Sequence, residues 1–121
     1  MEKKKVFVSQ PMANKSREAI ERERHLIMDA LPSLLNDADL IEIPMLSELV
    51  AFSNSPATCI GMSIQDMANA DIVVFAPGWR DARGCVVEHA VCLLYKIPYV
   101  ELINDSSRYE ITVDGRLKDD A

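Results

Sequence analysis

One segment of the chain, Gly78–Ala90 (GWRDARGCVVEHA), gathers several side chains that could do chemistry. Glu88 is its candidate nucleophile or general base, because a carboxylate can attack the anomeric carbon of a glycoside and form a covalent glycosyl-enzyme intermediate. In that interpretation, N–H groups at the start of a helix and nearby arginines would hold Glu88 ionised. The alternative is structural: Glu88 is a carboxylate in the first turn of a helix, where the macrodipole favours negative charge.

The same segment contains candidate ligand-binding residues. Arg80 and Arg83 could bind a phosphate, because a guanidinium matches phosphate geometry with two parallel hydrogen bonds; alternatively, they are solvated charges that balance Asp81. Trp79 could stack on a base or sugar, or it could cover the end of a sheet. His89 could donate to a ligand, orient the neighbouring carboxylate or serve as a structural donor to the backbone.

The apolar pattern predicts the elements that position these residues. We expect strands over Lys5–Ser9, Asp39–Pro44, Asp71–Ala76 and Pro98–Ile103, and helices over Lys15–Leu31, Ala57–Asn69 and Cys85–Lys96. The uninterrupted apolar run of Asp71–Ala76 is typical of a central parallel strand covered on both faces. In the first helix, Ile20, Ile27 and Leu31 share one face, and charged residues such as Arg24 lie mainly outside it.

Three further expectations concern the ends of elements and the segments that connect them. Pro32 should end the first helix, because proline disfavours continuation. Met45–Pro56 mixes apolar and polar residues, and we expect a loop with one helical turn. Tyr109–Leu117 should form a small hairpin around Asp114-Gly115.

Alternating strands and helices indicate one α/β domain over residues 1–121, with an open parallel sheet. Such sheets bind ligands beyond the carboxyl ends of their strands, where the strand order reverses. If the first strand is central and the third is its neighbour, the loops Ser9–Asn14 and Pro77–Gly84 straddle that crevice. Two of the four glycines, Gly78 and Gly84, lie in the second loop.

Composition excludes several other classes. The chain has 121 residues and a formal net charge of −6, which argues against a nucleic-acid polymer as partner, because such proteins usually carry a basic excess. No apolar stretch approaches the roughly 18 residues of a membrane span, and no signal peptide is indicated, so we expect a cytoplasmic protein without membrane partners. Three cysteines without CxxC spacing, two distant histidines and no glycine-rich nucleotide motif indicate neither a metal nor a cofactor.

Three motifs resemble those of one known family. VFVSQPM (Val6–Met12), ADIVVFAPGW (Ala70–Trp79) and ARGCVVEHA (Ala82–Ala90) are similar to motifs of small bacterial and phage proteins in the nucleoside 2-deoxyribosyltransferase superfamily. The similarity runs from Val6 to about Leu102. It implies a flavodoxin-like fold, which agrees with the sheet of about four parallel strands flanked by helices that the apolar pattern predicts, followed by the small C-terminal hairpin. It also implies a homo-oligomer whose active sites are completed by a neighbouring subunit.

The resemblance implies roles for individual residues and a nucleoside or nucleotide as the small-molecule partner. Glu88 takes the place of the nucleophile, and Gly84 lets the ligand approach the backbone. The loop after the first strand lines the sugar and base pocket; its residues here are Ser9, Gln10, Pro11 and Met12.

The chain departs from the family pattern at three places. Ser63 stands where the transferases have a second carboxylate that assists proton transfer, and Asp66, three residues later, could replace it only if the helix shifted. Ala82 stands at the place of another acidic residue, with Asp81 beside it. Gln10 replaces a common glycine. General acid–base assistance contributes about 10²–10⁴-fold, so its loss would leave a binder or a different reaction.

The sequence therefore supports three hypotheses. The first is an enzyme acting on the N-glycosidic bond of a nucleoside or nucleotide, by hydrolysis or base exchange, with Glu88 as nucleophile and Ser63 or Asp66 as a weak helper. The second is a non-catalytic module that binds or sequesters a nucleotide. The third is a structural oligomer with a vestigial pocket, because the helix Cys85–Lys96 is apolar on more than one side.

Overall fold

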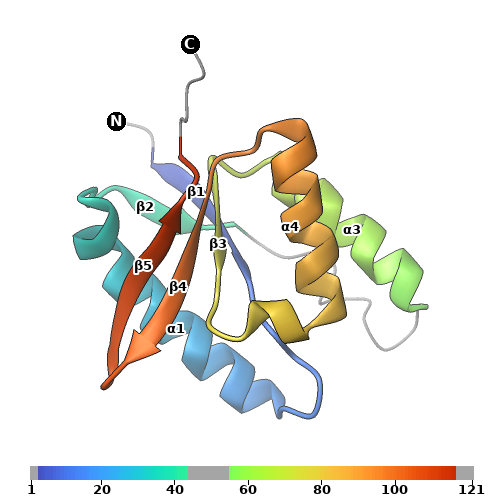
Figure 1. Cartoon of the computed structure of the whole chain (residues 1–121), viewed down its shortest axis with the longest axis horizontal. Coiled ribbons are helices and arrows are strands. Elements are labelled where there is room, and N and C mark those ends of the chain that lie inside the picture. Colours follow the sequence, from blue (N-terminus) through green and yellow to red (C-terminus); the bar gives the residue numbers. More distant parts are fainter. Residues whose placement is uncertain (1–2, 44–54, 117–121) are drawn as a thin grey trace.

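The computed structural model describes residues 3–43 and 55–116. Within them, one sheet has the strand order β2-β1-β3-β4-β5 (Figure 1). The strands are β1 (Lys4–Ser9), β2 (Leu40–Glu42), β3 (Ile72–Phe75), β4 (Tyr99–Asp105) and β5 (Arg108–Asp114). Strands β1 to β4 run parallel, and β5 pairs antiparallel with β4. The chain therefore forms a mostly parallel α/β sheet, as its alternation of strands and helices predicts.

Helices cover both faces of this sheet. One face carries α1 (Arg17–Leu35), whereas α3 (Pro56–Ala68) and α4 (Arg83–Tyr95) lie on the other (Figure 1). A short 3₁₀ helix, η1 (Trp79–Asp81), connects β3 to α4. Right-handed crossovers account for the two layers, because the chain moves outward from β1 to β2 and then returns past β1 to β3. The strand order thus reverses between β1 and β3.

The core lies between the central strands and the two helical layers. All four residues of β3 are buried, and Val73 and Val74 have no exposed surface. From the other side, α1 inserts Ile27 and Leu31, which are four positions apart and completely buried. Since β1 and β4 flank β3 on its two edges, the run Asp71–Ala76 contains the covered central strand that it predicts.

The prediction that Pro32 ends the first helix is wrong. The helix continues through Pro32 to Leu35, and Asn36 then adopts a left-handed conformation with φ of 54°. A proline near the end of a helix removes only one backbone hydrogen bond. The last turn is held by the buried side chain of Leu35 and closed by the bond from the Asn36 N–H to the Ser33 carbonyl, at 3.3 Å.

The predicted C-terminal hairpin is confirmed, because β5 pairs antiparallel with β4, but the prediction that its turn lies at Asp114-Gly115 is wrong. The reversal occurs at Ser106 and Ser107, which have φ of 52° and 71°, and the strand that follows, β5, pairs with β4. Two central residues with positive φ match the twist of the flanking strands, as in a type I′ turn. Gly115 serves a different purpose, because a Cβ there would collide with the Tyr99 ring.

The other boundaries lie close to their predicted positions. The strand expected over Asp39–Pro44 covers Leu40–Glu42, and Pro44 lies outside the described residues. Most of Met45–Pro56 lies outside them too; Pro56 opens α3, after Ser55 caps it. Over residues 3–43 and 55–116, no helix combines the length and apolarity needed to cross a bilayer.

Candidate functional site

A cavity of about 720 Å³ lies beside the carboxyl end of β1, between α3 and the start of α4. Both loops expected to straddle the crevice contribute to its wall: Ser9, Gln10 and Met12 from the first, and residues 81–84 from the second. Apolar side chains such as Ile60 of α3 line the opposite wall. A cavity of this size and mixed character suits a small organic ligand.

Glu88 lies at the base of this cavity and is only 6% exposed. The Ser9 hydroxyl donates to its Oε1 at 2.6 Å, which joins the end of β1 to the middle of α4. The helix begins at Arg83, since Ala82 is extended and accepts the N–H of Val86. Glu88 therefore lies in the second turn rather than the predicted first turn, and the macrodipole does not account for its position.

Burial raises the pKa of the Glu88 carboxyl above its ordinary value. Hydrogen bonds from Ser9 and Ser63 oppose this shift, and the charge of Asp66 adds to it. The expectation that helix-start N–H groups and arginines hold Glu88 ionised is thus wrong, because the groups that stabilise its charge are serine hydroxyls. The carboxyl holds its proton more tightly than an exposed glutamate does.

The two candidate helpers on α3 are placed differently. Ser63 lines the cavity beside Glu88, whereas Asp66 is buried and is not part of the lining. Asp66 is 4% exposed, and its charge acts on the Glu88 carboxyl from behind the cavity wall. Asp81, at the end of η1, is the second carboxylate among the described lining residues.

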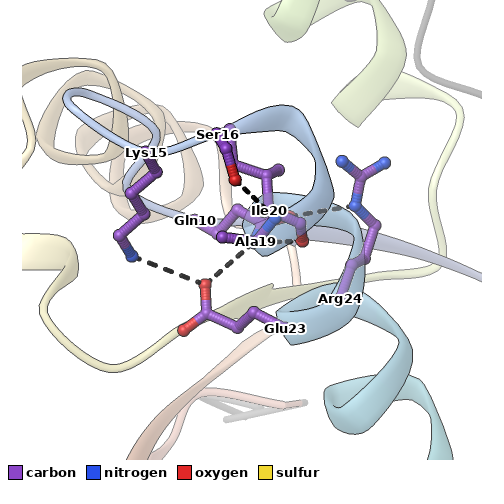
Figure 2. A network of polar contacts seen from close by, with 7 residues as sticks. All are labelled: Gln10, Lys15, Ser16, Ala19, Ile20, Glu23 and Arg24. Atoms are coloured by element: carbon purple, nitrogen blue, oxygen red, sulfur yellow. Dashed lines mark hydrogen bonds and ion pairs between the residues drawn. The ribbon is translucent and has the colours of Figure 1, made fainter.

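Gln10 borders the cavity, but its side-chain amide is bonded to α1. Its Oε1 accepts from Nε of Arg24 at 2.9 Å, and its Nε2 donates to the carbonyl of Ile20 at 3.1 Å and to Glu23 at 2.8 Å (Figure 2). Pro11 is not part of the lining and lies next to Gly78. Of the loop predicted to hold sugar and base, the cavity therefore receives mainly Ser9 and Met12 side chains.

Trp79 and His89 lie together outside the cavity. Their rings stack with centroids 4.0 Å apart, and Phe75 and Tyr99 contact the same imidazole. The imidazole Nε2 is hydrogen-bonded to Oε2 of Glu101 at 2.8 Å. Trp79 is buried in this cluster, which favours its interpretation as a cover for the end of the sheet, and it also lines a second, smaller hollow.

The two candidate phosphate ligands are separated. Arg83 lines the cavity, together with Gly84. Arg80 instead donates to Glu101 at 3.3 Å, lies over the Trp79 ring, and lines a separate hollow of about 310 Å³ that also includes Gly78. The structure therefore brings together Ser9, Ser63, Asp81, Arg83, Gly84 and Glu88, and leaves Gly78, Trp79, Arg80 and His89 outside.

The burial of two charged residues was not predicted from the sequence. Arg24, expected outside the apolar face of its helix, is only 7% exposed and forms an ion pair with Glu42 at 3.2 Å. Its spacing from Ile20 and Ile27 was a signal, because positions three and four apart share a helical face. Glu101 is buried within β4, where it interrupts an apolar strand.

The described residues show no group of three or more histidine, cysteine, aspartate or glutamate side chains placed to hold a metal ion. No family model, curated protein or solved structure matches the chain.

Proposed function

We propose that the protein is an enzyme that cleaves the N-glycosidic bond of a nucleoside or nucleotide, with Glu88 as nucleophile. The observation that carries this proposal is the placement of Glu88: a buried carboxyl at the base of a 720 Å³ cavity, fixed by the Ser9 hydroxyl. Attack of the ionised carboxylate on the anomeric carbon forms a glycosyl ester and releases the base. Water then completes hydrolysis, or a second base completes exchange.

The departing base needs a proton, and the cavity supplies a candidate donor. Asp81 lines the same cavity as Glu88, and a carboxyl group within reach of the base could serve as general acid. Ser63 keeps the role of a helper that orients Glu88, because its hydroxyl bonds to the carboxylate. Asp66 acts through Glu88 rather than on the substrate.

Two further features support this assignment. The parallel order β2-β1-β3-β4, with β5 added antiparallel at one edge, supports a flavodoxin-like arrangement. The cavity lies near the reversal of strand order between β1 and β3, where such sheets bind ligands. Both features agree with the resemblance to the nucleoside 2-deoxyribosyltransferase superfamily.

Arg83 favours a substrate with a phosphate. Arg83 lines the cavity, whereas Arg80 is engaged with Glu101. We therefore expect nucleoside monophosphates to be preferred over nucleosides, through charge-assisted hydrogen bonds.

A non-catalytic nucleotide-binding module is the second candidate. Ser63, in place of a second carboxylate, is the observation that favours it, because a serine hydroxyl cannot protonate a departing base as a carboxylic acid can. In this case the cavity would bind a nucleotide and leave its glycosidic bond intact.

One experiment separates the two candidates. The protein is incubated with deoxynucleosides, ribonucleosides and their monophosphates, with and without a second free base, and released base is followed chromatographically. We expect release that disappears in Glu88→Ala and persists in Glu110→Gln, which changes an exposed glutamate of β5. Thermal shifts by nucleotides without any release would favour the binding module, and release undiminished in Glu88→Ala would refute the proposed nucleophile.

A further inference from the structure

A polar network centred on two buried side chains, Gln10 and Arg24, links three elements on the face of the sheet opposite α4. It consists of Gln10 after β1, Ile20, Glu23 and Arg24 in α1, and Glu42 at the end of β2, and we call it the Arg24 network. Nε of Arg24 donates to Gln10 at 2.9 Å, and the Gln10 amide donates to Ile20 and Glu23 (Figure 2). Nη1 of Arg24 also donates to Glu42, at 3.2 Å. Every polar atom of the Gln10 side chain is thereby bonded.

The network adjoins the residue that holds Glu88. Ser9 and Gln10 are consecutive, and side chains alternate between the faces of a sheet at such positions. Accordingly, Ser9 points to Glu88 of α4, and Gln10 points to α1. Because one peptide unit joins the two residues, holding the Gln10 side chain restricts the backbone position from which the Ser9 hydroxyl reaches Glu88.

A contribution to folding stability does not by itself explain why the chain has such a network. Arg24 is 7% exposed and Gln10 is 5% exposed. Replacing a buried ion pair with apolar residues is often neutral or stabilising, whereas a fully bonded polar group fixes one geometry. The network is therefore better suited to define the position of the β1 end than to supply folding free energy.

We propose that Gln10 and Arg24 are positioning residues, which hold the end of β1 so that the Ser9 hydroxyl stays bonded to Glu88. The side-chain hydrogen bonds of the network join them to α1, β2 and each other rather than to Glu88, so they act through Ser9. The importance of this role for catalysis rests on the proposed function, but the coupling itself exists without substrate.

The test is an NMR titration of the Glu88 carboxyl carbon, assigned by comparison with Glu88→Gln. Ser9→Ala should raise the measured pKa, because it removes a hydrogen bond to the charged form. Gln10→Met and Arg24→Lys should raise it in the same direction by a smaller amount. Both variants preserve charge. They also leave unchanged the other groups that interact with Glu88, which are Ser63 and Asp66 from α3 and Cys85 and Cys92 from α4.

Gln65→Met is the matched control, because Gln65 is the other glutamine and lies exposed on α3. It should titrate like the unsubstituted protein. The thermal transition of each variant verifies that it folds. If Gln10→Met does not fold, the titration of Glu88 in Arg24→Lys tests the proposal. A Glu88 titration unchanged in the folded network variants, or in Ser9→Ala, would overturn the proposal. Absence of base release would refute the proposed function and leave this coupling intact.

Discussion

Glu88 should make the stability of the protein depend on pH. Burial raises its pKa in the folded state, so the folded protein binds this proton more tightly than the unfolded chain. The stabilising contribution is therefore present below the ordinary glutamate pKa and is lost as pH rises through the raised value. We expect Glu88→Gln to have a higher melting temperature than the unsubstituted protein at pH 8 and to lose this difference near pH 4. Each kcal/mol of added unfolding free energy corresponds to about 4 °C in melting temperature. Equal differences at both pH values would contradict this.

The three cysteines should differ sharply in reactivity. Burial raises the pKa of Cys85 to about 11 and that of Cys92 to about 12, so both remain protonated thiols at pH 8. Cys59 is only partly buried and lines the cavity. Ellman's reagent should modify one thiol rapidly in the native protein and all three in denaturant.

Cys59→Ser should remove the rapid phase, and a nucleotide in the cavity should slow it in the unsubstituted protein. Rapid modification that persists in Cys59→Ser would place the reactive thiol elsewhere. A nucleotide that protects Cys59 without losing its base would favour the binding module over the enzyme.

Residue types at the site were easier to predict than the contacts between them. Glu88 stands out because a carboxylate follows a loop after a central strand. That Ser9 and Ser63 are its hydrogen-bonding partners depends on the packing of β1 and α3 against α4, which local sequence does not encode. Likewise, Trp79 and His89 are typical ligand-binding residue types, but their stacking on each other and the bond of His89 to Glu101 depend on β4.

At the scale of elements, the apolar pattern predicted the positions of strands and helices, whereas single residues expected to end an element or form a turn did not. The buried run of β3 and the apolar face of α1 predict their elements, because burial is shared by many residues. Pro32 did not end its helix, because burial of Leu35 outweighs the preference of one proline. Asp114-Gly115 did not form the turn, because strand pairing along β5 outweighs the preference of two residues. The helix start at Arg83 was missed because Ala82 has no side chain that caps it.

The turn between β4 and β5 can be improved. Ser106 and Ser107 both have positive φ, a conformation that costs non-glycine residues roughly 1–2 kcal/mol, and Asn-Gly is the preferred pair for such turns. Ser106→Asn combined with Ser107→Gly should increase the free energy of unfolding by about 1 kcal/mol, measured by urea denaturation. Gly115→Ala is the contrasting variant, which should destabilise the protein because the added Cβ meets the Tyr99 ring. A destabilised Asn-Gly variant would contradict the assigned turn.

For the whole molecule, the alternation of strands and helices predicted the class of sheet, but it located the crevice only on the condition that β1 is central and β3 is its neighbour. The strand order meets this condition, and the loops after both strands contribute to the cavity. The distribution of the second loop between two hollows was not predictable, because it depends on η1. In this short helix, Asp81 lines both hollows, whereas Trp79 and Arg80 line the smaller one, beside Glu101.

We infer that the protein assembles into a homo-oligomer through α4. Leu93, Leu94 and Tyr95 are 56%, 76% and 75% exposed, and Val86 adds a further exposed apolar side chain on the same helix. Clustered exposed apolar side chains of this kind mark interaction surfaces. Since Val87 of the same helix lines the cavity, a subunit docked on α4 would lie close to the candidate site.

Leu94→Glu tests this assembly by sedimentation velocity. The substitution should dissociate the oligomer into single chains, because a buried unpaired carboxylate at an interface is costly. The monomer's own fold should be little affected, since Leu94 contributes little to the core. Leu26→Glu is the matched control, because Leu26 is 52% exposed on α1, on the opposite face of the sheet, and should leave assembly unchanged. Base release that falls with dissociation would indicate a site completed by the neighbouring subunit, whereas an unsubstituted protein that sediments as a single chain would refute assembly through α4.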